Sequence, residues 1–315
     1  MRNHQLTSEE RYALSALRRQ GHSQAAIARE LGRHPSTISR ELQRNSRKDG
    51  GYRPFTAGEM TRGRRGRSRR NWRFGEQDWA LVVSRLELHW SPEQIAGRLR
   101  RDRLLAISHE TIYRYVWYNK RMGGSLYLFL RGSRKKKWKR YRSYDSRGRM
   151  RGKRPISERP VGAENRSRVG HLEGDTVIGA FDRHCILTLV DRKTGYVMIG
   201  KLFGRTTAAT NRRAAALIRN APRRTLSLTV DNGTEFHGFK TLEKATGAPI
   251  YFATPHHSWE RGTSENTNGL IRQFLPKRTS MAHVTQRACT RLATALNSRP
   301  RKRHGYLTPA ELYEG

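Results

Sequence analysis

Three acidic side chains stand in settings that could bring them together for chemistry: Asp175 in HLEGDTVIG, Asp231 after the apolar run LSLTV, and Glu265 in RGTSENTNGLIRQF. Clustered carboxylates repel one another, and bound Mg²⁺ relieves that repulsion because hard cations prefer oxygen ligands. Two such ions, roughly 3.5–4 Å apart, can activate the attacking oxygen and stabilise the leaving oxygen of a phosphoryl displacement. We therefore predict a two-metal Mg²⁺ site, in which Mn²⁺ substitutes, at these three acids. For Asp231 alone, in Asp-Asn-Gly, an ordinary turn is the alternative.

The elements expected around the acids form a mixed sheet with helices. Short runs rich in β-branched and apolar residues predict three antiparallel strands and, after intervening helices, two more: 171–178, 184–190, 196–202, 226–230 and 248–253,. Asp175 lies on the first strand and Asp231 at the end of the fourth, and these two strands can be neighbours. Glu265 falls near the start of a helix expected from about 263 to 275, which would bring it across that end of the sheet.

Five segments of the chain together carry a family resemblance: EGDTVIG, DRKTGYV, DNGTEF, RGTSENTNGLIRQFLPK and LNSRPRKRHGYLTPAELY. They resemble the insertion sequence 30 family of bacterial transposases. The resemblance implies the RNase H-like fold of DDE transposases and retroviral integrases, with Asp175, Asp231 and Glu265 as the catalytic acids. It also implies action on the terminal inverted repeats of the element through a circular or joined-end intermediate. The chain departs from the family pattern at Leu172, where tryptophan is expected, and at Arg278, where glycine is expected.

The charge balance points to a nucleic-acid partner. The 315 residues carry a formal net charge of +38, and 42 of the 64 Lys and Arg residues lie before residue 171. So large a charge implies a polyanion, and we expect double-stranded DNA, both the terminal repeats and the target. The sequence has neither a long apolar run nor a signal peptide, so we expect no membrane and a bacterial cytoplasmic, nucleoid-associated protein. Cys185 and Cys289 are expected to be free thiols.

The first 46 residues have the pattern of a helix-turn-helix domain. Two predicted helices precede Gly32, and Pro35 suits the first position of a third,. Ile27, Leu31, Ile38 and Leu42 would fill the core between them. The third helix would present six side chains to a DNA groove: Ser36, Thr37, Ser39, Arg40, Gln43 and Arg44. A solvated polar helix face is the alternative for these residues.

A second helix-turn-helix unit is expected over residues 76–120. Ser91 and Gln94 would form a capping box at the start of its middle helix, with Pro92 at the first helical position,. Its last helix would offer His109, Thr111 and Arg114 to DNA, although Trp117 and Tyr118 could instead serve protein contacts. The core would contain four apolar residues: Ile95, Leu99, Ile112 and Val116.

Basic segments separate these expected domains. Residues 47–75 form a Gly/Arg-rich connector, of a kind that is usually disordered, and 121–165 a basic linker,. In the linker Trp138, Tyr141 and Tyr144 lie among cations, which suits a segment that orders on DNA. Residues 166–315 would form the catalytic domain. The expected fold class is therefore multidomain α and α/β, with helix-turn-helix units followed by an RNase H-like domain built on a mixed five-stranded sheet.

Arg272 follows Glu265 by seven residues, about two helical turns, so a continuous helix would place both on one face. We expect its guanidinium to grip a DNA phosphate beside the metals; a solvated surface arginine is the alternative. Transposition requires two DNA ends held together, so we expect a homodimer or higher homo-oligomer on DNA. Two other functions remain open: a non-enzymatic helix-turn-helix regulator, which would not need the acids, and a metal-dependent nuclease without strand transfer.

Overall fold

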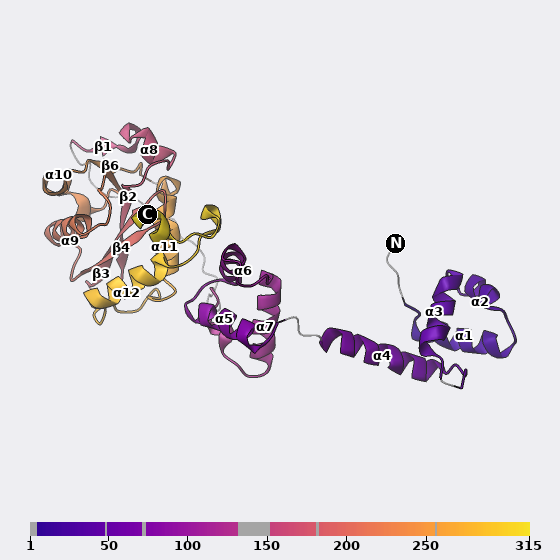
Figure 1. The fold of residues 1–315 in the computed structure, drawn as a ribbon. Helices are drawn as coiled ribbons and strands as arrows, with labels where there is room; N and C mark the ends of the chain where they lie inside the picture. The colour runs from indigo at the N-terminus through magenta and orange to yellow at the C-terminus, as the bar shows by residue number, and fades with distance from the viewer. Residues whose placement is uncertain (1–4, 48, 71–73, 132–151, 181–182, 256) are drawn as a thin grey trace. The chain divides into compact units, whose positions relative to one another are not determined.

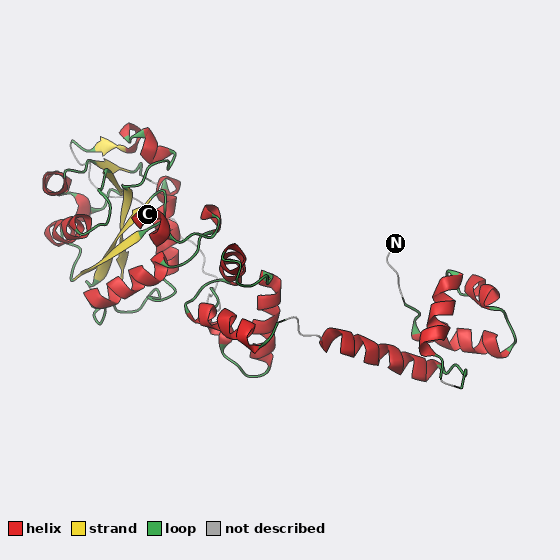
Figure 2. Ribbon diagram, in the orientation of Figure 1, coloured by secondary structure: helices red, strands yellow, loops and turns green. Residues whose placement is uncertain are grey.

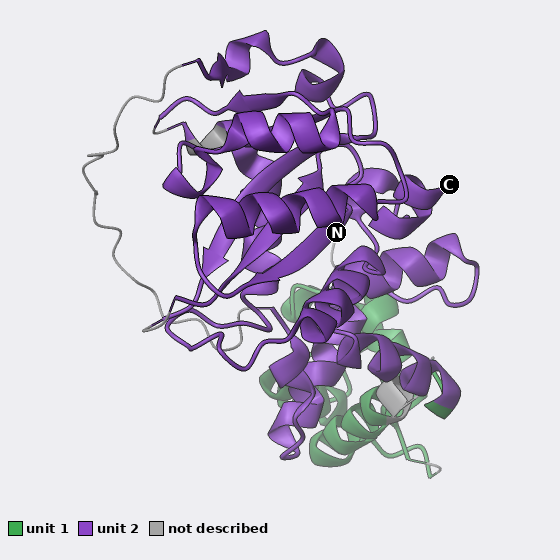
Figure 3. Cartoon of the chain, turned by 90° about the vertical axis from the view of Figure 1, so that its left-hand side faces the viewer, with its two compact units in different colours: residues 1–76 green, residues 77–315 purple. Residues whose placement is uncertain are grey.

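The computed structural model describes residues 5–47, 49–70, 74–131, 152–180, 183–255 and 257–315. The chain divides into two compact units, residues 1–76 and 77–315 (Figure 3). The expected borders at 120 and 165 do not separate compact units, because the second group of helices and the sheet belong to the same one. The aromatic residues of the basic linker, Trp138, Tyr141 and Tyr144, lie outside the described residues.

Three short helices build the core of the first unit (Figure 1): α1 (Ser8–Arg19), α2 (Gln24–Glu30) and α3 (Pro35–Asn45). A turn at Gly32 joins α2 to α3, and its φ of 60° is a conformation that glycine adopts without strain,. The expected core residues Ile27, Ile38 and Leu42 are buried, and Leu31 packs against them. The helix-turn-helix pattern in the sequence therefore corresponds to a small core of its own.

A fourth helix, α4 (Pro54–Arg70), lies where the sequence indicated a disordered connector. Ala57 and Thr61 on its first turns are buried. The guanidinium of Arg11 on α1 donates to Glu41 on α3, with Nε 2.7 Å from Oε1, and to Thr61 Oγ1 at 3.3 Å. The structure thus differs from the expectation because tertiary contacts hold this stretch, and a charge count along the sequence does not register them.

The second unit begins with a group of three helices and a short 3₁₀ turn: α5 (Glu76–Glu87), α6 (Pro92–Arg101), α7 (His109–Arg121) and η1 (Leu126–Phe129). The capping box at Ser91 and Gln94 is present. The four expected core residues are all at most 1% exposed: Ile95, Leu99, Ile112 and Val116. The partly buried rings of Trp79 and Tyr115 stack with centroids 3.8 Å apart.

The rest of the second unit is a mixed sheet with helices (Figure 2). Its strands are β1 (Arg154–Pro155), β2 (His171–Ile178), β3 (Cys185–Asp191), β4 (Val197–Leu202), β5 (Ser227–Val230) and β6 (Ile250–Phe252), in the order β1-β6-β5-β2-β3-β4. The strands β2, β3 and β4 are antiparallel, whereas β5 is parallel to both β2 and β6. The expected mixed α/β class is confirmed.

Within the described residues the sheet has six strands, and the expectation of five missed β1. This two-residue strand pairs in parallel with the edge strand β6, with Arg154 opposite Tyr251 and Pro155 opposite Phe252. A strand this short, with a proline and no apolar alternation, leaves no periodic signal in the sequence, and proline is tolerated at a sheet edge.

Helices cover both faces of the sheet (Figure 1), and each face has its own buried cluster. The helical elements of this region are η2 (Ile156–Glu158), α8 (Val161–Glu164), α9 (Thr207–Arg219), η3 (Thr234–Phe236), α10 (Phe239–Thr246), η4 (Ser258–Arg261), α11 (Gly262–Ile271), α12 (Gln286–Asn297), η5 (Lys302–His304) and α13 (Pro309–Glu314). Leu242 of α10 and Ala214 of α9 pack on one face; Ile271 of α11 and Leu296 of α12 pack on the other. Both cysteines are buried free thiols, as expected.

The C-terminal segment ties the α5–α7 helices to the sheet. Arg98 of α6 forms an ion pair with Glu311 of α13, with Nη1 2.8 Å from Oε2. Gln94 Nε2 donates to the carbonyl of Pro300 at 2.8 Å. Contacts between residues about 200 positions apart explain why the two regions form one compact unit.

Candidate active site

The register of two neighbouring strands places Asp175 beside Asp231. In the parallel pair of β2 and β5, Leu172 lies opposite Leu228 and Glu173 opposite Thr229. Carrying this offset two residues further brings Asp175 level with Asp231, the first residue after β5. The spacing of the two acids in the sequence is therefore the spacing that the sheet register requires.

One guanidinium bridges the two aspartates. Arg261 Nη1 lies 3.6 Å from Asp175 Oδ1, and Arg261 Nη2 lies 3.5 Å from Asp231 Oδ2. The side chains of Asp175 and Asp231 are 22% and 28% exposed, respectively, so the site opens to solvent. The two carboxylates therefore converge on a common position, and a donor set of carboxylate oxygens around one cation fits a hard divalent metal.

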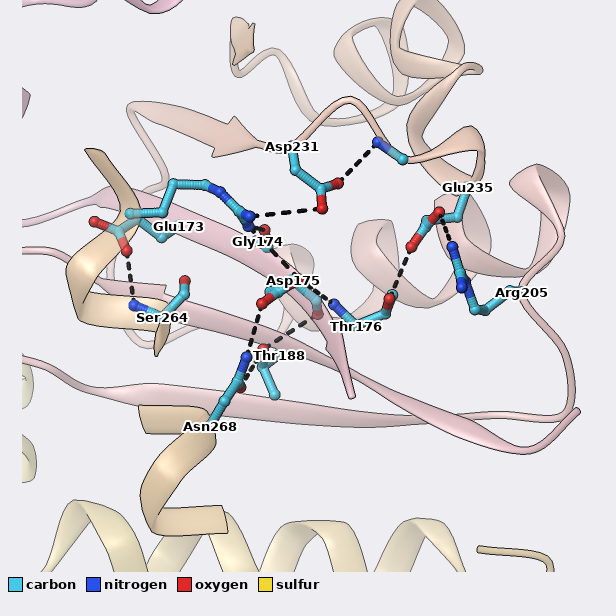
Figure 4. Close-up of polar contacts among 12 residues, drawn as sticks. Glu173, Gly174, Asp175, Thr176, Thr188, Arg205, Asp231, Glu235, Ser264 and Asn268 are labelled. Atoms are coloured by element: carbon cyan, nitrogen blue, oxygen red, sulfur yellow. Dashed lines mark hydrogen bonds and ion pairs between the residues drawn. The ribbon is translucent and has the colours of Figure 1, made fainter. Parts of the chain in front are cut away.

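Each aspartate is held by its own hydrogen bonds (Figure 4). Asn268 Nδ2 on α11 donates to Asp175 Oδ2 at 2.7 Å, and the Asp175 Oδ1 atom accepts the backbone N–H of Thr176 at 2.9 Å. Asp231 Oδ1 accepts the backbone N–H of Gly233 at 2.9 Å. Burial raises the pKa of Asp175, and Asp231 raises it further, against the opposing charge of Arg261. A cation close to Asp175 favours the charged form of its carboxylate.

Helix α11 lies along β2 and is fastened to it at three points. Glu173 Oε2 accepts the backbone N–H of Ser264 at 2.7 Å, near the start of the helix. The contact of Asn268 with Asp175 follows one turn later, and Arg272 Nη2 donates to the carbonyl of Ile178 at 2.9 Å after the helix ends. The helix that carries the third acid is thus aligned with the strand that carries the first.

Glu265 is exposed on the first turn of α11, between the first two of these attachments. Within the described residues, no three His, Cys, Asp or Glu side chains are close enough together to hold a metal ion. The structure thus brings Asp175 and Asp231 together and places Glu265 on the adjoining helix. Asn268 of the same helix and Arg261, the residue just before it, both face the aspartates.

Arg272 is not in the continuous helix that the sequence suggested, because α11 ends at Ile271. Its guanidinium donates to the carbonyls of Ile178 and, at 3.4 Å, Leu275. Burial lowers its pKa. Arg272 is therefore half-buried beside Ile178, the last residue of β2, which follows Asp175 by three positions.

Two buried acids that the sequence analysis did not identify lie next to the candidate site and support it. Glu173 is fully buried and pairs with Arg192, which is 4% exposed. Glu235 is also buried; its Oε1 accepts Thr176 Oγ1 at 2.7 Å and its Oε2 accepts Arg205 Nη2 at 2.8 Å. The available signal for Glu173 was its position two residues before Asp175, since alternate residues of a strand share one face.

Gly233 is needed because of these acids. A Cβ at this position would lie 2.5 Å from Glu235 Oε2 and 2.8 Å from Asp231 Oδ1, both far inside van der Waals contact. The glycine of the Asp-Asn-Gly sequence therefore allows the turn to pass between two carboxylates, which a turn preference alone would not explain.

In the first unit, the predicted DNA-contact residues lie on an accessible face of α3. Ser39, Arg40, Gln43 and Arg44 are exposed, while Ser36 and Thr37 are partly buried. A pocket of about 440 Å³ lies between α3 and α4, and Thr37, Arg40, Arg44, Arg64 and Arg65 are among its lining residues. The arginines of α4 thus join those of α3 on one surface, which the sequence did not indicate.

In the second group of helices, His109 and Arg114 on α7 are exposed. Thr111 is partly buried, and its Oγ1 lies 2.9 Å from Ser108 Oγ at the helix cap. Trp117 and Tyr118 are 48% and 46% exposed on the same helix. This surface therefore combines aromatic and basic groups.

Comparisons with known proteins agree with this architecture. Residues 2–45 match a family model described as a helix-turn-helix domain. The chain is 38% identical to the transposase for insertion sequence element IS4351 of Bacteroides fragilis, covering 98% of this chain and 95% of that protein. It is 39% identical to transposase InsI for insertion sequence element IS30A of Escherichia coli (strain K12), covering 92% and 78%. It is 36% identical to the transposase for insertion sequence element IS1086 of Cupriavidus metallidurans, covering 98% and 94%.

These matches extend over nearly the whole chain and both compact units. The class they define is the transposase of a bacterial insertion sequence. The chain belongs to the insertion sequence 30 family of transposases, which confirms the resemblance of its motifs. Among solved structures, the catalytic core domain of BIV integrase matches 46% of this chain at 20% identity with a TM-score of 0.36. In the described part of the chain, none of the helices has the length and apolar character to span a membrane.

Proposed function

We propose that this transposase binds the terminal inverted repeats of its insertion sequence and catalyses metal-dependent cleavage and transfer of DNA strands at Asp175, Asp231 and Glu265. The observation that carries the proposal is the sheet register that sets the two aspartates side by side, with one cationic group shared between them. Two uncharged side chains would fill a purely structural role equally well. Two converging carboxylates are, in contrast, suited to binding a metal ion.

The residues have distinct roles in this proposal. Asp175, within β2, and Asp231, just after β5, would hold the metal, and Glu265 would complete the ligand set from α11. Asn268 orients Asp175 through its hydrogen bond of 2.7 Å. Arg261 offsets part of the negative charge of the two aspartates in the absence of metal. Mg²⁺, or Mn²⁺ in its place, would supply Lewis-acid activation of the attacking oxygen and charge stabilisation of the leaving one.

The same site can perform both cleavage and joining, because its acids hold metal and form no covalent intermediate with the DNA. Water as the nucleophile gives strand cleavage, and a freed 3′-hydroxyl gives strand transfer. Recognition is assigned to the exposed residues of α3, with the arginines of α4 beside them, and to His109, Thr111 and Arg114 in the second group of helices. Arg272 is proposed to contact a phosphate next to the metal site.

The test separates metal binding, DNA binding and chemistry. Asp175→Asn, Asp231→Asn and Glu265→Gln should each abolish cleavage and joining while binding of terminal-repeat DNA survives. Mn²⁺ affinity, followed by electron paramagnetic resonance, should fall in each variant. Glu87→Gln, an exposed acid at the end of α5, controls for loss of one negative charge and should behave as wild type. A single variant that cleaves normally would remove its residue from the proposed site.

Assembly and reaction outcome are tested with the element's own ends. Joining requires two ends, so end DNA should convert the protein to a dimer or larger species in light scattering, whereas random DNA of equal length should not. Cleavage without joining under these conditions would instead support a nuclease. We place the reaction in the bacterial cytoplasm, on the nucleoid, because its substrate is chromosomal DNA.

A further inference from the structure

A second pocket, of about 490 Å³, lies on the far side of α11 from the aspartates. Its walls come from the start of α6, the first turns of α11 and the segment around η5. Gly262, Thr263 and Asn266 of α11 line it, and so does Ser91 at the N-cap of α6. Asn268, on the same helix, faces Asp175 instead. One helix, with a diameter of about 10–12 Å including side chains, therefore separates this pocket from the candidate metal site.

The pocket is strongly cationic. Five basic residues line it: Arg131, Arg166, Arg301, Lys302 and Arg303. Glu93 is the one acid among the described lining residues, and it is already engaged, with Lys302 Nζ 2.6 Å from its Oε1. The four arginines thus face the pocket with no lining carboxylate left to balance them.

The hydrogen bonds of Arg301 and Arg303 go to uncharged groups, although the charges of Asp191 and Glu173 act on Arg303. Arg301 Nη2 donates to the carbonyl of Leu296 at 3.1 Å, and Arg303 Nη2 donates to the carbonyl of Lys193 at 3.3 Å. A carbonyl accepts a hydrogen bond but carries no net charge. Burial lowers the pKa of Arg301 to about 10, and repulsion from Arg303 and Arg131 contributes to that lowering. Like charges gathered around one pocket repel one another, and a bound anion relieves that repulsion.

The geometry favours a phosphate as that anion. A guanidinium presents a planar fork of donors that matches two oxygens of a phosphate. The first turns of α6 and α11 both open on the pocket, and each is the start of a ten-residue helix. The positive end of a helix dipole adds to the attraction for an anion.

We propose that this pocket binds a backbone phosphate of the DNA strand that enters the carboxylate site, so that α11 has DNA on both sides. The proposal rests on the proposed function, because it takes DNA as the substrate. It adds a contact made jointly by the α5–α7 helices and the catalytic sheet, which the predicted recognition residues do not include.

The full-length chain is compared with two doubly substituted variants of equal charge change. Arg166→Gln/Arg303→Gln removes two exposed arginines of the pocket. Arg212→Gln/Arg219→Gln removes two exposed arginines of α9, on the opposite face of the sheet. Binding of a random-sequence duplex is measured in EDTA over a series of salt concentrations. Each phosphate contact contributes a slope of about −0.9 to log K against log salt, so the pocket variant should lose about one such contact relative to the α9 variant.

Thermal unfolding supplies a second readout. Replacing chloride with inorganic phosphate at matched ionic strength should stabilise the wild type and the α9 variant more than the pocket variant. In chloride, the pocket variant should unfold at or above the wild-type temperature, because it loses repulsion. Equal salt slopes for the two variants would overturn the proposal. Stabilisation by phosphate without a change in salt slope would also overturn it and assign the pocket to a free phosphate compound.

These measurements need neither metal nor cleavage. Failure of the pocket proposal would therefore leave the assignment of the acids intact, and a catalytic failure of the acids would leave these binding results standing.

Discussion

Replacing Glu173 with glutamine should loosen the candidate site and destabilise the second unit alone. The carboxylate of Glu173 has no solvent exposure and faces two donors, the guanidinium of Arg192 and the backbone N–H of Ser264. The side chain of glutamine would direct its NH₂ group toward one of these two donors, so that two hydrogen-bond donors would face each other. It also leaves the charge of Arg192 buried without its counter-ion.

The size of the effect follows from the burial. Removing one partner of a buried ion pair costs about 3–5 kcal/mol, because the remaining charge stays desolvated. For a unit of roughly 150–250 residues, each kcal/mol lowers the unfolding temperature by about 2–4 °C. The second unit should therefore unfold about 6–20 °C earlier. The first unit, which has its own core, should keep its transition.

Differential scanning calorimetry of the full chain can follow both units. Glu110→Gln is the matched control, because Glu110 pairs with Arg114 at 3.7 Å on the surface of the same unit, with side chains 71% and 81% exposed. Such an exposed pair contributes about 0–1 kcal/mol. At a temperature where both variants are folded, Glu173→Gln should also cleave more slowly, since the start of α11 has lost its attachment. A second-unit transition that moves no further than in Glu110→Gln would refute the reasoning.

Three more predictions address single contacts. Gly233→Ala should lower cleavage by about 10²-fold without affecting DNA binding, because its Cβ would displace the carboxylate of Asp231,; normal cleavage would contradict this. Arg272→Ala should lower cleavage and joining by about 10²-fold with end binding retained, and Arg272→Lys should recover part; unchanged rates would leave it a structural residue. The hydrogen bond from Arg98 lowers the pKa of Glu311 to about 2, so its stabilisation is complete above pH of about 4.5 and disappears as pH falls toward 2. Denaturant unfolding of Glu311→Gln should lack that part of the acid dependence, and identical profiles would count against the contact.

The sequence by itself determined the elements and the family. Short runs rich in β-branched and apolar residues predicted β2, β3 and β4 nearly to the residue, and Gly32 with Pro35 located the turn between α2 and α3. The reason is that these signals are local: side-chain periodicity, helix caps and turn conformations act within a few residues. The residues of the five sequence motifs also indicated the family, and the relatives confirm it.

Only the tertiary structure decided which other side chains contact the two aspartates. That Arg261 lies between the aspartates, and that Asn268 faces Asp175 while Glu265 is exposed, depends on how α11 rotates against β2. The partnership of Glu173 with Arg192 depends on the pairing of β2 with β3. A linear sequence does not encode these contacts in any local pattern.

The same holds for the wider assembly of each of the two units. Helix α4 is held by a buried contact from Arg11, and α6 by Gln94 and Arg98 to the C-terminal segment. A count of charged residues along the chain records only a run of arginines and a basic linker. Burial and the position of like charges around a pocket arise from packing between distant segments, and for that reason the fold, rather than the sequence, locates the candidate phosphate site.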